Sequence, residues 1–237
     1  MLFLQRFMAS HDLGFSFVGS SRTKLPTKVK LGGRFVDLTY PQDEGYISDI
    51  INLWLDDEYG IQKITESPQT IVDIGGNIGL FSLWAWSHFP MARIYTYEPN
   101  PRVLDCLLKN LKPTNALVRA AGVSCTSGRA EIKDASDSRL AATSLSESGN
   151  IDIISLSQIV EDVGGRIDLL KLDCEGAEWE IFKDIDAFQN IESIRMEYHL
   201  NEAHSLESLK VVTKSLGYKM VRLSPNQGFG IAWFEKQ

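Results

Sequence analysis

After Pro68, apolar strand-like segments alternate with segments of helical spacing along the rest of the chain. This alternation is typical of a parallel sheet built from β-α units, in which each helix connects two neighbouring strands. The predicted strands are TIVDI (70–74), RIYTYE (93–98), ALVRAAG (116–122), IDLLKLD (167–173), SIRMEYH (193–199), KMVRL (219–223) and GIAWFE (230–235). We therefore expect an α/β fold with a doubly wound, mostly parallel seven-stranded sheet whose last strand is antiparallel.

The segments between these strands predict the helices that cover the sheet. Helices are expected at about 79–88, 100–111, 155–162, 176–188 and 204–216. GRAEIK (128–133) predicts a short additional strand, and the Ser-rich stretch 135–150 predicts an exposed, mobile loop.

Residues 1–67 have a different pattern and predict a strand and helix extension that packs on a core domain of residues 68–237. KVKLGGRFVDLTY (28–40) alternates around two glycines like a hairpin, and 45–61 has apolar residues at helical spacing. The opening MLFLQRFM (1–8) predicts a short N-terminal strand or docking segment. It is interrupted by Arg6 and precedes no small-residue cleavage site, so we expect no secretory signal.

Composition excludes several classes of protein. Apolar residues make up 43% of the 237 residues, and no apolar run reaches the ~18 residues that a membrane span requires. The net charge of −7 repels phosphate backbones, so we expect no nucleic-acid partner. RTKLPTKVK (22–30) is the one basic stretch, interpreted as a solvated loop and edge strand. Cys106, Cys125 and Cys174 lack the spacing of zinc ligands or of a disulfide framework, which favours the cytoplasm.

The stretch VDIGGNIG (72–79) predicts a binding turn between the first core strand and the following helix. Asp73 ends the strand, and Gly75, Gly76, Asn77 and Gly79 bring backbone amides to the carboxyl edge of the sheet. The spacing departs from the GxGxxG fingerprint, which disfavours a dinucleotide. An acidic acceptor beside amide donors instead suits a ligand that carries an ammonium and a carboxylate, as S-adenosylmethionine does. Alternatively, the glycines only relieve crowding between strand and helix.

Glu98 ends the next strand, about 20 positions after the glycine turn. An acid at this place accepts both ribose hydroxyls of a nucleoside ligand in sheets of this kind. We expect the adenine between Pro99 and the segment AAGV (120–123), which includes Ala121, and Tyr46 closing over the ligand.

Four further residues end the fourth and fifth core strands and predict the catalytic centre: Asp173, Glu175, Glu197 and His199. Because these strand ends are neighbours in a doubly wound sheet, one of the four is expected to be a general base. His199 has a suitable unperturbed pKa, and burial beside other acids would raise the pKa of a carboxylate. Alternatively, Asp173, Glu197 and His199 hold a divalent metal. Glu178 is interpreted as a charge at a helix N-terminus.

The motifs VDIGGNIGLFSLWAW, ARIYTYEPNPRVLDCLLKN, IDLLKLDCEGAEWEIF and IRMEYH together resemble the FkbM-type methyltransferases, a branch of the class I S-adenosylmethionine-dependent enzymes. DDEYG (56–60) is similar to the segment that precedes the core in that family. The resemblance covers roughly residues 40–200. It implies a Rossmann-like fold and O-methylation of a hydroxyl on a small molecule, a sugar or another glycan acceptor, or a secondary metabolite.

Two other functions stay open at this point. The chain could be an inactive nucleotide-binding or regulatory module of the same fold, although several acids in one cleft would then cost stability without use. An NAD-binding oxidoreductase is disfavoured by Asn77 and by the missing third glycine.

Overall fold

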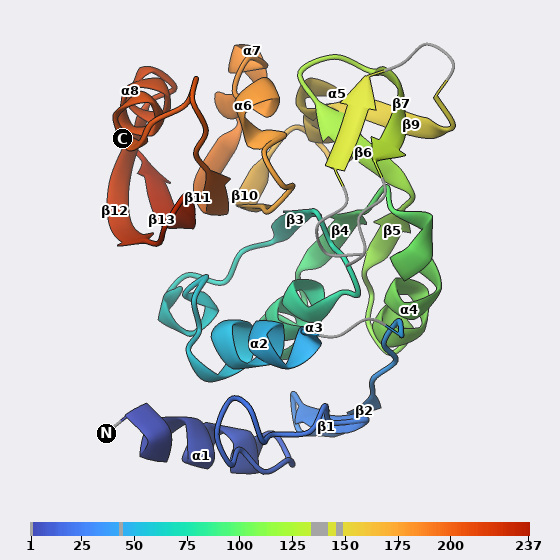
Figure 1. Ribbon diagram of the computed structural model, residues 1–237. Helices are drawn as coiled ribbons and strands as arrows, with labels where there is room; N and C mark the ends of the chain where they lie inside the picture. Colours follow the sequence, from blue (N-terminus) through green and yellow to red (C-terminus); the bar gives the residue numbers. More distant parts are fainter. Residues whose placement is uncertain (1, 43–44, 134–141, 146–148) are drawn as a thin grey trace.

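The computed structural model describes residues 2–42, 45–133, 142–145 and 149–237. A seven-stranded sheet lies at its centre, with helices on both faces (Figure 1). In spatial order its strands are β12 (Tyr218–Pro225), β13 (Phe229–Lys236), β11 (Ile191–His199), β10 (Ile167–Leu172), β3 (Thr70–Ile74), β4 (Arg93–Tyr97) and β5 (Leu117–Arg119). β13 is antiparallel to both of its neighbours, and every other pair in the sheet is parallel. The predicted mixed sheet and its antiparallel last strand are confirmed.

Strand β3 is fully buried because it lies between β10 and β4 in the middle of the sheet. Its register aligns Asp73 with Lys171 on one side and with Thr96 on the other. The carboxyl ends of β3, β4, β10 and β11 therefore meet at one edge, where parallel sheets bind ligands.

The predicted helices form, with one exception. They are α3 (Leu80–His88), α4 (Pro101–Leu111), α5 (Leu156–Asp162) and α8 (Leu206–Ser215). Local signals explain their starts: the Asn100 side chain caps α4 ahead of Pro101, and Ser205 forms a capping box on α8. The helix predicted over 176–188 is instead two short helices, α6 (Glu178–Ile181) and α7 (Ile185–Phe188).

A second sheet was not predicted. Its order is β6 (Ala121–Ser124), β9 (Ile151–Ser155), β7 (Gly128–Lys133) and β8 (Ala142–Leu145). The single strand predicted over 116–122 is wrong, because the chain leaves the main sheet after β5 and pairs with β9 from Ala121 onward. β8 lies within the predicted loop 135–150, of which 135–141 and 146–148 fall outside the described residues. Antiparallel pairing with β7 creates β8 in a segment whose composition carries little strand signal.

The N-terminal part contains helix α1 (Leu2–Asp12), so the strand predicted for the first residues is wrong. The predicted hairpin is confirmed as β1 (Lys28–Leu31) and β2 (Arg34–Asp37). The predicted helical segment forms α2 (Tyr46–Ile50) and continues as the π-helix η1 (Ile51–Leu55), before the 3-10 helix η2 (Ile61–Lys63).

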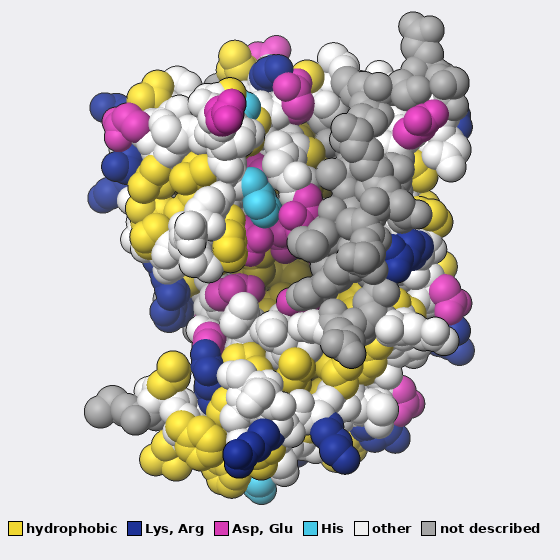
Figure 2. Space-filling model, viewed as in Figure 1, with side chains coloured by type: hydrophobic (Ala, Val, Ile, Leu, Met, Phe, Trp, Pro, Cys, Tyr) yellow, Lys and Arg dark blue, Asp and Glu magenta, His cyan; other side chains and the backbone are white. Residues whose placement is uncertain are grey.

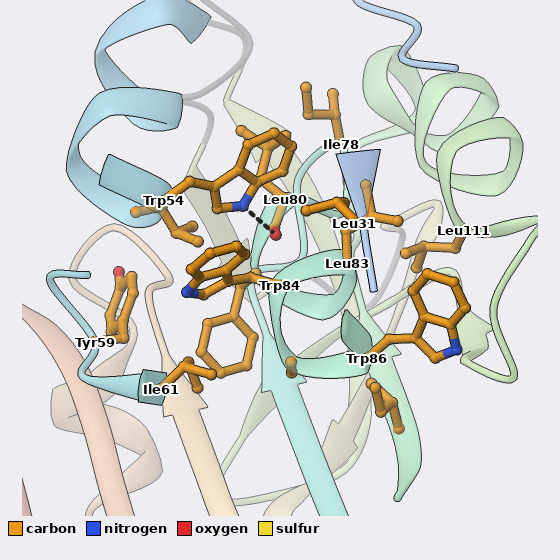
Figure 3. Close-up of a cluster of buried hydrophobic side chains, with 14 of the residues drawn as sticks. Leu31, Trp54, Tyr59, Ile61, Ile78, Leu80, Leu83, Trp84, Trp86 and Leu111 are labelled. Atoms are coloured by element: carbon orange, nitrogen blue, oxygen red, sulfur yellow. Dashed lines mark hydrogen bonds between the residues drawn. The ribbon is translucent and has the colours of Figure 1, made fainter. Parts of the chain in front are cut away.

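The N-terminal part shares one hydrophobic core with helix α3. Figure 3 shows Trp54 and Trp84 against each other, and the Trp54 indole donates to the carbonyl of Leu80 at 3.0 Å. Leu31 and Trp86 belong to the same buried cluster, so the tryptophans of α3 fill the core. The segment that precedes the main sheet is therefore held directly against the helix that follows the glycine turn. The domain boundary at residue 67 stays a prediction.

The cysteines and the apolar character of the helices were both subjects of predictions from the sequence. Cys106, Cys125 and Cys174 are free thiols. Among the described residues, no helix has both the length and the apolar character to cross a membrane.

Candidate active site

A cavity of about 340 Å³ opens at the carboxyl edge of the main sheet, within the size range of small-molecule sites. Its wall is formed by the ends of β3, β4, β10 and β11, by the N-terminal part and by β6. Figure 2 shows a hollow at the centre of this face, with acidic side chains gathered along it. Of the predicted cofactor residues, Gly75, Gly76, Asn77, Glu98, Pro99 and Ala121 line the cavity, whereas Asp73 and Gly79 do not.

The glycine turn is bare because its surroundings leave no room for side chains. A Cβ atom on Gly75 would lie 1.7 Å from the Asp173 carbonyl oxygen, and one on Gly76 would lie 2.2 Å from the Thr96 side chain. Gly79 caps α3 in the left-handed region, with φ 88°. The crowding explanation for the glycines therefore holds, and it applies to residues that also border the cavity.

The prediction that the amides of this turn are free donors is wrong. The amides of Gly75 and Gly76 both donate to the Tyr97 carbonyl, and the amide of Asn77 donates to Glu98 at 2.8 Å. The first amides of α3 have no acceptor within their own helix, as at any helix N-terminus. Ile78 and Leu80 border the cavity there. The backbone amides suited to bind an anion are therefore those at the start of α3 and not those of the glycine turn.

Asp73 lies beneath the cavity rather than on its wall, so its predicted role as acceptor for a ligand cation is wrong. Its side chain is fully buried. Oδ2 accepts from the Ser82 hydroxyl at 2.7 Å, and Oδ1 pairs with the Lys171 ammonium at 3.1 Å. Lys171 is therefore the cation that Asp73 binds.

Glu98 is held as the sequence predicts, at the end of β4 and on the cavity wall. One carboxyl oxygen accepts from the amide of Asn77 and the other from the amide of Asn100 at 2.7 Å. Burial raises the pKa of Glu98 to about 7, although the two amides favour the charged form. These amides fix the carboxyl group in one orientation, with further acceptor capacity on both oxygens.

Tyr46 comes from the N-terminal part and lines the cavity, close to the glycine turn. Its hydroxyl donates to the Asn77 side chain at 3.2 Å. The sequence placed Tyr46 over the ligand only because the preceding helix had to pack nearby.

Asp173, Glu175 and Glu197 all line the cavity, so the structure brings three of the four predicted catalytic residues together there. Burial, then repulsion by Asp173, raises the pKa of Glu175 to about 7. Burial also raises the pKa of Glu197. Glu175 adopts a left-handed backbone conformation, with φ 54°, which is uncommon outside glycine. Such strain is found at functional sites, where the surrounding structure enforces it.

His199 lies behind these acids and is held by Glu178. The fully buried Glu178 accepts from the His199 amide at 3.0 Å and lies 2.7 Å from Nδ1. Nε2 lies 3.3 Å from Glu197 and 3.5 Å from Glu175. Burial opposes protonation, but these carboxylates raise the pKa of His199 to about 10. The prediction that His199 acts as a general base with an unperturbed pKa is therefore wrong, because an imidazole with this raised pKa is charged at neutral pH. Glu178 is a partner of His199 and not only a helix charge.

Sequence reasoning missed several cavity residues, among them Glu58, Tyr59 and Lys171. The Tyr59 hydroxyl donates to Asp173 at 3.0 Å. Burial, then repulsion by Asp173 and Glu197, raises the pKa of Glu58 to about 8. Two signals were usable: the lone lysine inside the apolar strand LLKL, and the segment DDEYG (56–60), which contains Glu58 and Tyr59.

The alternative of a metal site gains no support. Within the ranges that the structure describes, no three His, Cys, Asp or Glu side chains are placed to hold a metal ion. His199 is instead engaged by carboxylates on both ring nitrogens.

Comparison with known proteins agrees with this fold. The chain is 28% identical over 173 residues to methyltransferase sdnD of Sordaria araneosa, covering 56% of this chain and 66% of that protein. It is 30% identical over 194 residues to the AMB antimetabolite synthetase AmbE of Pseudomonas aeruginosa, covering 62% of this chain and 9% of that protein. The matches thus span less than two thirds of these curated relatives.

The fibrillarin pre-rRNA processing protein of Methanococcus jannaschii has a similar fold, with a TM-score of 0.52 and 11% identity. The likeness covers 91% of this chain and 96% of that one. The sequence family is more specific, because the family model described as the methyltransferase FkbM domain matches residues 73–220. That range runs from Asp73 through Glu98 to the acids of β10 and β11. The chain belongs to the FkbM methyltransferase domain family.

Proposed function

We propose that this protein is an S-adenosylmethionine-dependent methyltransferase that methylates a hydroxyl group on a small molecule or a sugar. One observation carries the proposal. A single cavity contains a carboxyl group fixed for a ribose, Glu98, and a separate cluster of buried acids at the ends of β10 and β11.

The cofactor fits the residues on the β3 and β4 side of the cavity. Glu98 would accept the ribose hydroxyls, since both of its oxygens are oriented by amides and the residue lines the cavity. Pro99 and Ala121 would border the adenine. The amides at the start of α3 would bind the carboxylate of the cofactor. When bound, S-adenosylmethionine supplies a methyl group on a positively charged sulfur, which is activated toward an oxygen nucleophile.

The acid cluster supplies the proton acceptor that a hydroxyl nucleophile needs. A general base works best when its pKa lies near the working pH, and the pKa of Glu175 is raised to about 7. Glu175 also lines the cavity, whereas His199 does not. We therefore assign proton acceptance to Glu175. His199, held by Glu178, would orient Glu175 and Glu197.

The acceptor follows from the charge of the cavity. The carboxylates of Asp173 and Glu197 line it together with Glu175, whereas Glu58, whose pKa is raised to about 8, is mostly uncharged at neutral pH. Lys171 is already paired with Asp73 and Asp173. Such a wall repels phosphate groups and suits a neutral, hydroxyl-rich acceptor. This disfavours nucleic acid, as does the net charge of −7. A cytoplasmic location, favoured by the three free thiols, stays a prediction.

The proposal predicts that Glu98→Ala weakens binding of the product S-adenosylhomocysteine. The loss of charge-assisted hydrogen bonds is expected to cost about 1–3 kcal/mol, roughly five- to 150-fold in Kd by calorimetry. Glu192→Ala, at the amino end of β11 and outside the cavity, is the control and leaves the Kd unchanged. Thermal unfolding of both variants separates loss of binding from loss of fold. Unchanged affinity in Glu98→Ala would contradict the placement of the ribose.

Glu175→Gln removes the proposed proton acceptor and keeps the shape of the side chain. We expect turnover to fall by about 10²–10⁴-fold with unchanged affinity for S-adenosylhomocysteine. The assay follows a labelled methyl group from S-adenosylmethionine to a panel of hydroxylated small molecules and sugars. Glu180→Gln, an exposed acid on α6, is the control. Equal turnover of Glu175→Gln and wild type would remove the assignment.

His199 makes stability depend on pH. Its pKa is raised from 6.5 to about 10 in the folded protein, so its stabilising contribution is complete below pH 6.5. This contribution is lost as the pH rises through about 10. His199→Gln should therefore be less stable than wild type in urea unfolding at pH 6.5, and the difference should shrink toward pH 10. His11→Gln, on exposed α1, is the control. If the difference in unfolding free energy between His199→Gln and wild type did not depend on pH, the imidazole of His199 would not carry the proposed charge.

A further inference from the structure

The first 36 residues differ in charge from the rest of the chain. They contain a single acid, Asp12, and six basic residues: Arg6, Arg22, Lys24, Lys28, Lys30 and Arg34. The next residue, which ends β2, is a second acid, Asp37, and it pairs with Lys28 at 3.3 Å. The whole chain has 24 basic and 31 acidic residues. The N-terminal layer of α1, β1, β2 and the loop between α1 and β1 is therefore positively charged on a negatively charged protein.

The same layer carries an unusual amount of exposed apolar surface. Half of the large exposed hydrophobic side chains in the described part of the chain lie within its first 35 residues: Leu2, Phe3, Leu4, Phe7, Met8, Val18 and Phe35. Leu4 and Met8 are each 60% exposed. Contiguous apolar patches of this kind mark interaction surfaces.

Polar contacts hold α1 in an orientation that leaves these side chains outside. Arg6 pairs with Asp56 at the end of η1, with Nε to Oδ1 at 2.8 Å, and its guanidinium lies over the Phe17 ring. Ser10, the one buried residue of α1, accepts from the Phe17 amide at 3.0 Å. The helix is thus fixed through its polar side.

The apolar and basic side chains belong to one continuous surface. Phe3 contacts Phe17, with ring centroids 5.5 Å apart, and Val18 follows directly. At the other end, Gly14 lies against both Phe35 and the Lys30 side chain. Figure 1 shows α1, β1 and β2 as one layer below the rest of the molecule. Figure 2 shows apolar side chains at its lower left and Lys and Arg side chains along its lower edge.

We propose that this N-terminal layer docks on an anionic lipid surface. Apolar side chains that enter the interface, together with basic side chains beside acidic headgroups, are the features of peripheral membrane binding. Docking of a second copy through the same layer would bring two positively charged surfaces together. The hollow of the active-site face lies above this layer in Figure 2, so docking leaves it open.

Flotation with phosphatidylcholine vesicles, with and without phosphatidylserine, tests the proposal on the full chain. We expect binding to phosphatidylserine vesicles that weakens as salt is added. Lys24→Glu with Lys30→Glu should weaken it by about tenfold or more, and Phe7→Asp with Met8→Asp should weaken it as well. Lys214→Glu with Lys219→Glu is the control of equal charge change, and Met91→Asp is the apolar control at a 91% exposed site.

Several outcomes would overturn the proposal. The first is absence of wild-type binding to phosphatidylserine vesicles, and the second is equal weakening by the control variants. Capture by polyglutamate without vesicle binding would assign the layer to an acidic protein. Self-association that Phe7→Asp abolishes, again without vesicle binding, would assign it to a second copy. Thermal unfolding of each variant checks that the fold is intact, and the salt dependence of wild-type binding tests the proposal without any substitution.

Discussion

The buried ammonium of Lys171 connects the glycine turn with the acidic end of β10. It pairs with Asp73 at 3.1 Å and with Asp173 at 3.4 Å, and it donates to the Gly75 carbonyl at 2.5 Å. Burial disfavours its charge, but the two carboxylates raise its pKa above the ordinary value. One cation therefore ties the end of β3, the glycine turn and the end of β10 together. Without it, Asp73 would be an uncompensated charge in the core, which is strongly destabilising.

This arrangement separates two kinds of carboxyl group within one cavity. Glu98 is fixed by two backbone amides, and both of its oxygens keep acceptor capacity, which suits the recognition of neutral hydroxyls. Burial, with repulsion by Asp173, raises the pKa values of Glu175 and Glu197. Two carboxyl groups with different surroundings can take different roles in one reaction, binding in one case and proton acceptance in the other.

The sequence predicted the parts of this fold that depend on local patterns. The apolar runs of β3, β4, β10 and β11 located the strand ends, and with them the cavity residues Glu98, Asp173, Glu175 and Glu197. Pairings across the chain could not be predicted in this way. Asp73 was expected to face a ligand because nothing in the sequence shows that Lys171 neutralises it. Glu58 lines the cavity although it lies more than 100 residues before Asp173 in the sequence, and Glu178 binds His199, which lies 21 positions later. β6 and β8 depend on partner strands rather than on their own composition.

A crystal structure of the protein grown with S-adenosylhomocysteine tests the central claim most directly, because it locates the ligand without knowledge of the acceptor. The account predicts the ribose hydroxyls on Glu98, the ligand's carboxylate near the start of α3, and its sulfur facing the cluster of Glu175 and Glu197. A ligand bound outside this cavity, or one whose ribose has no contact with Glu98, would contradict it.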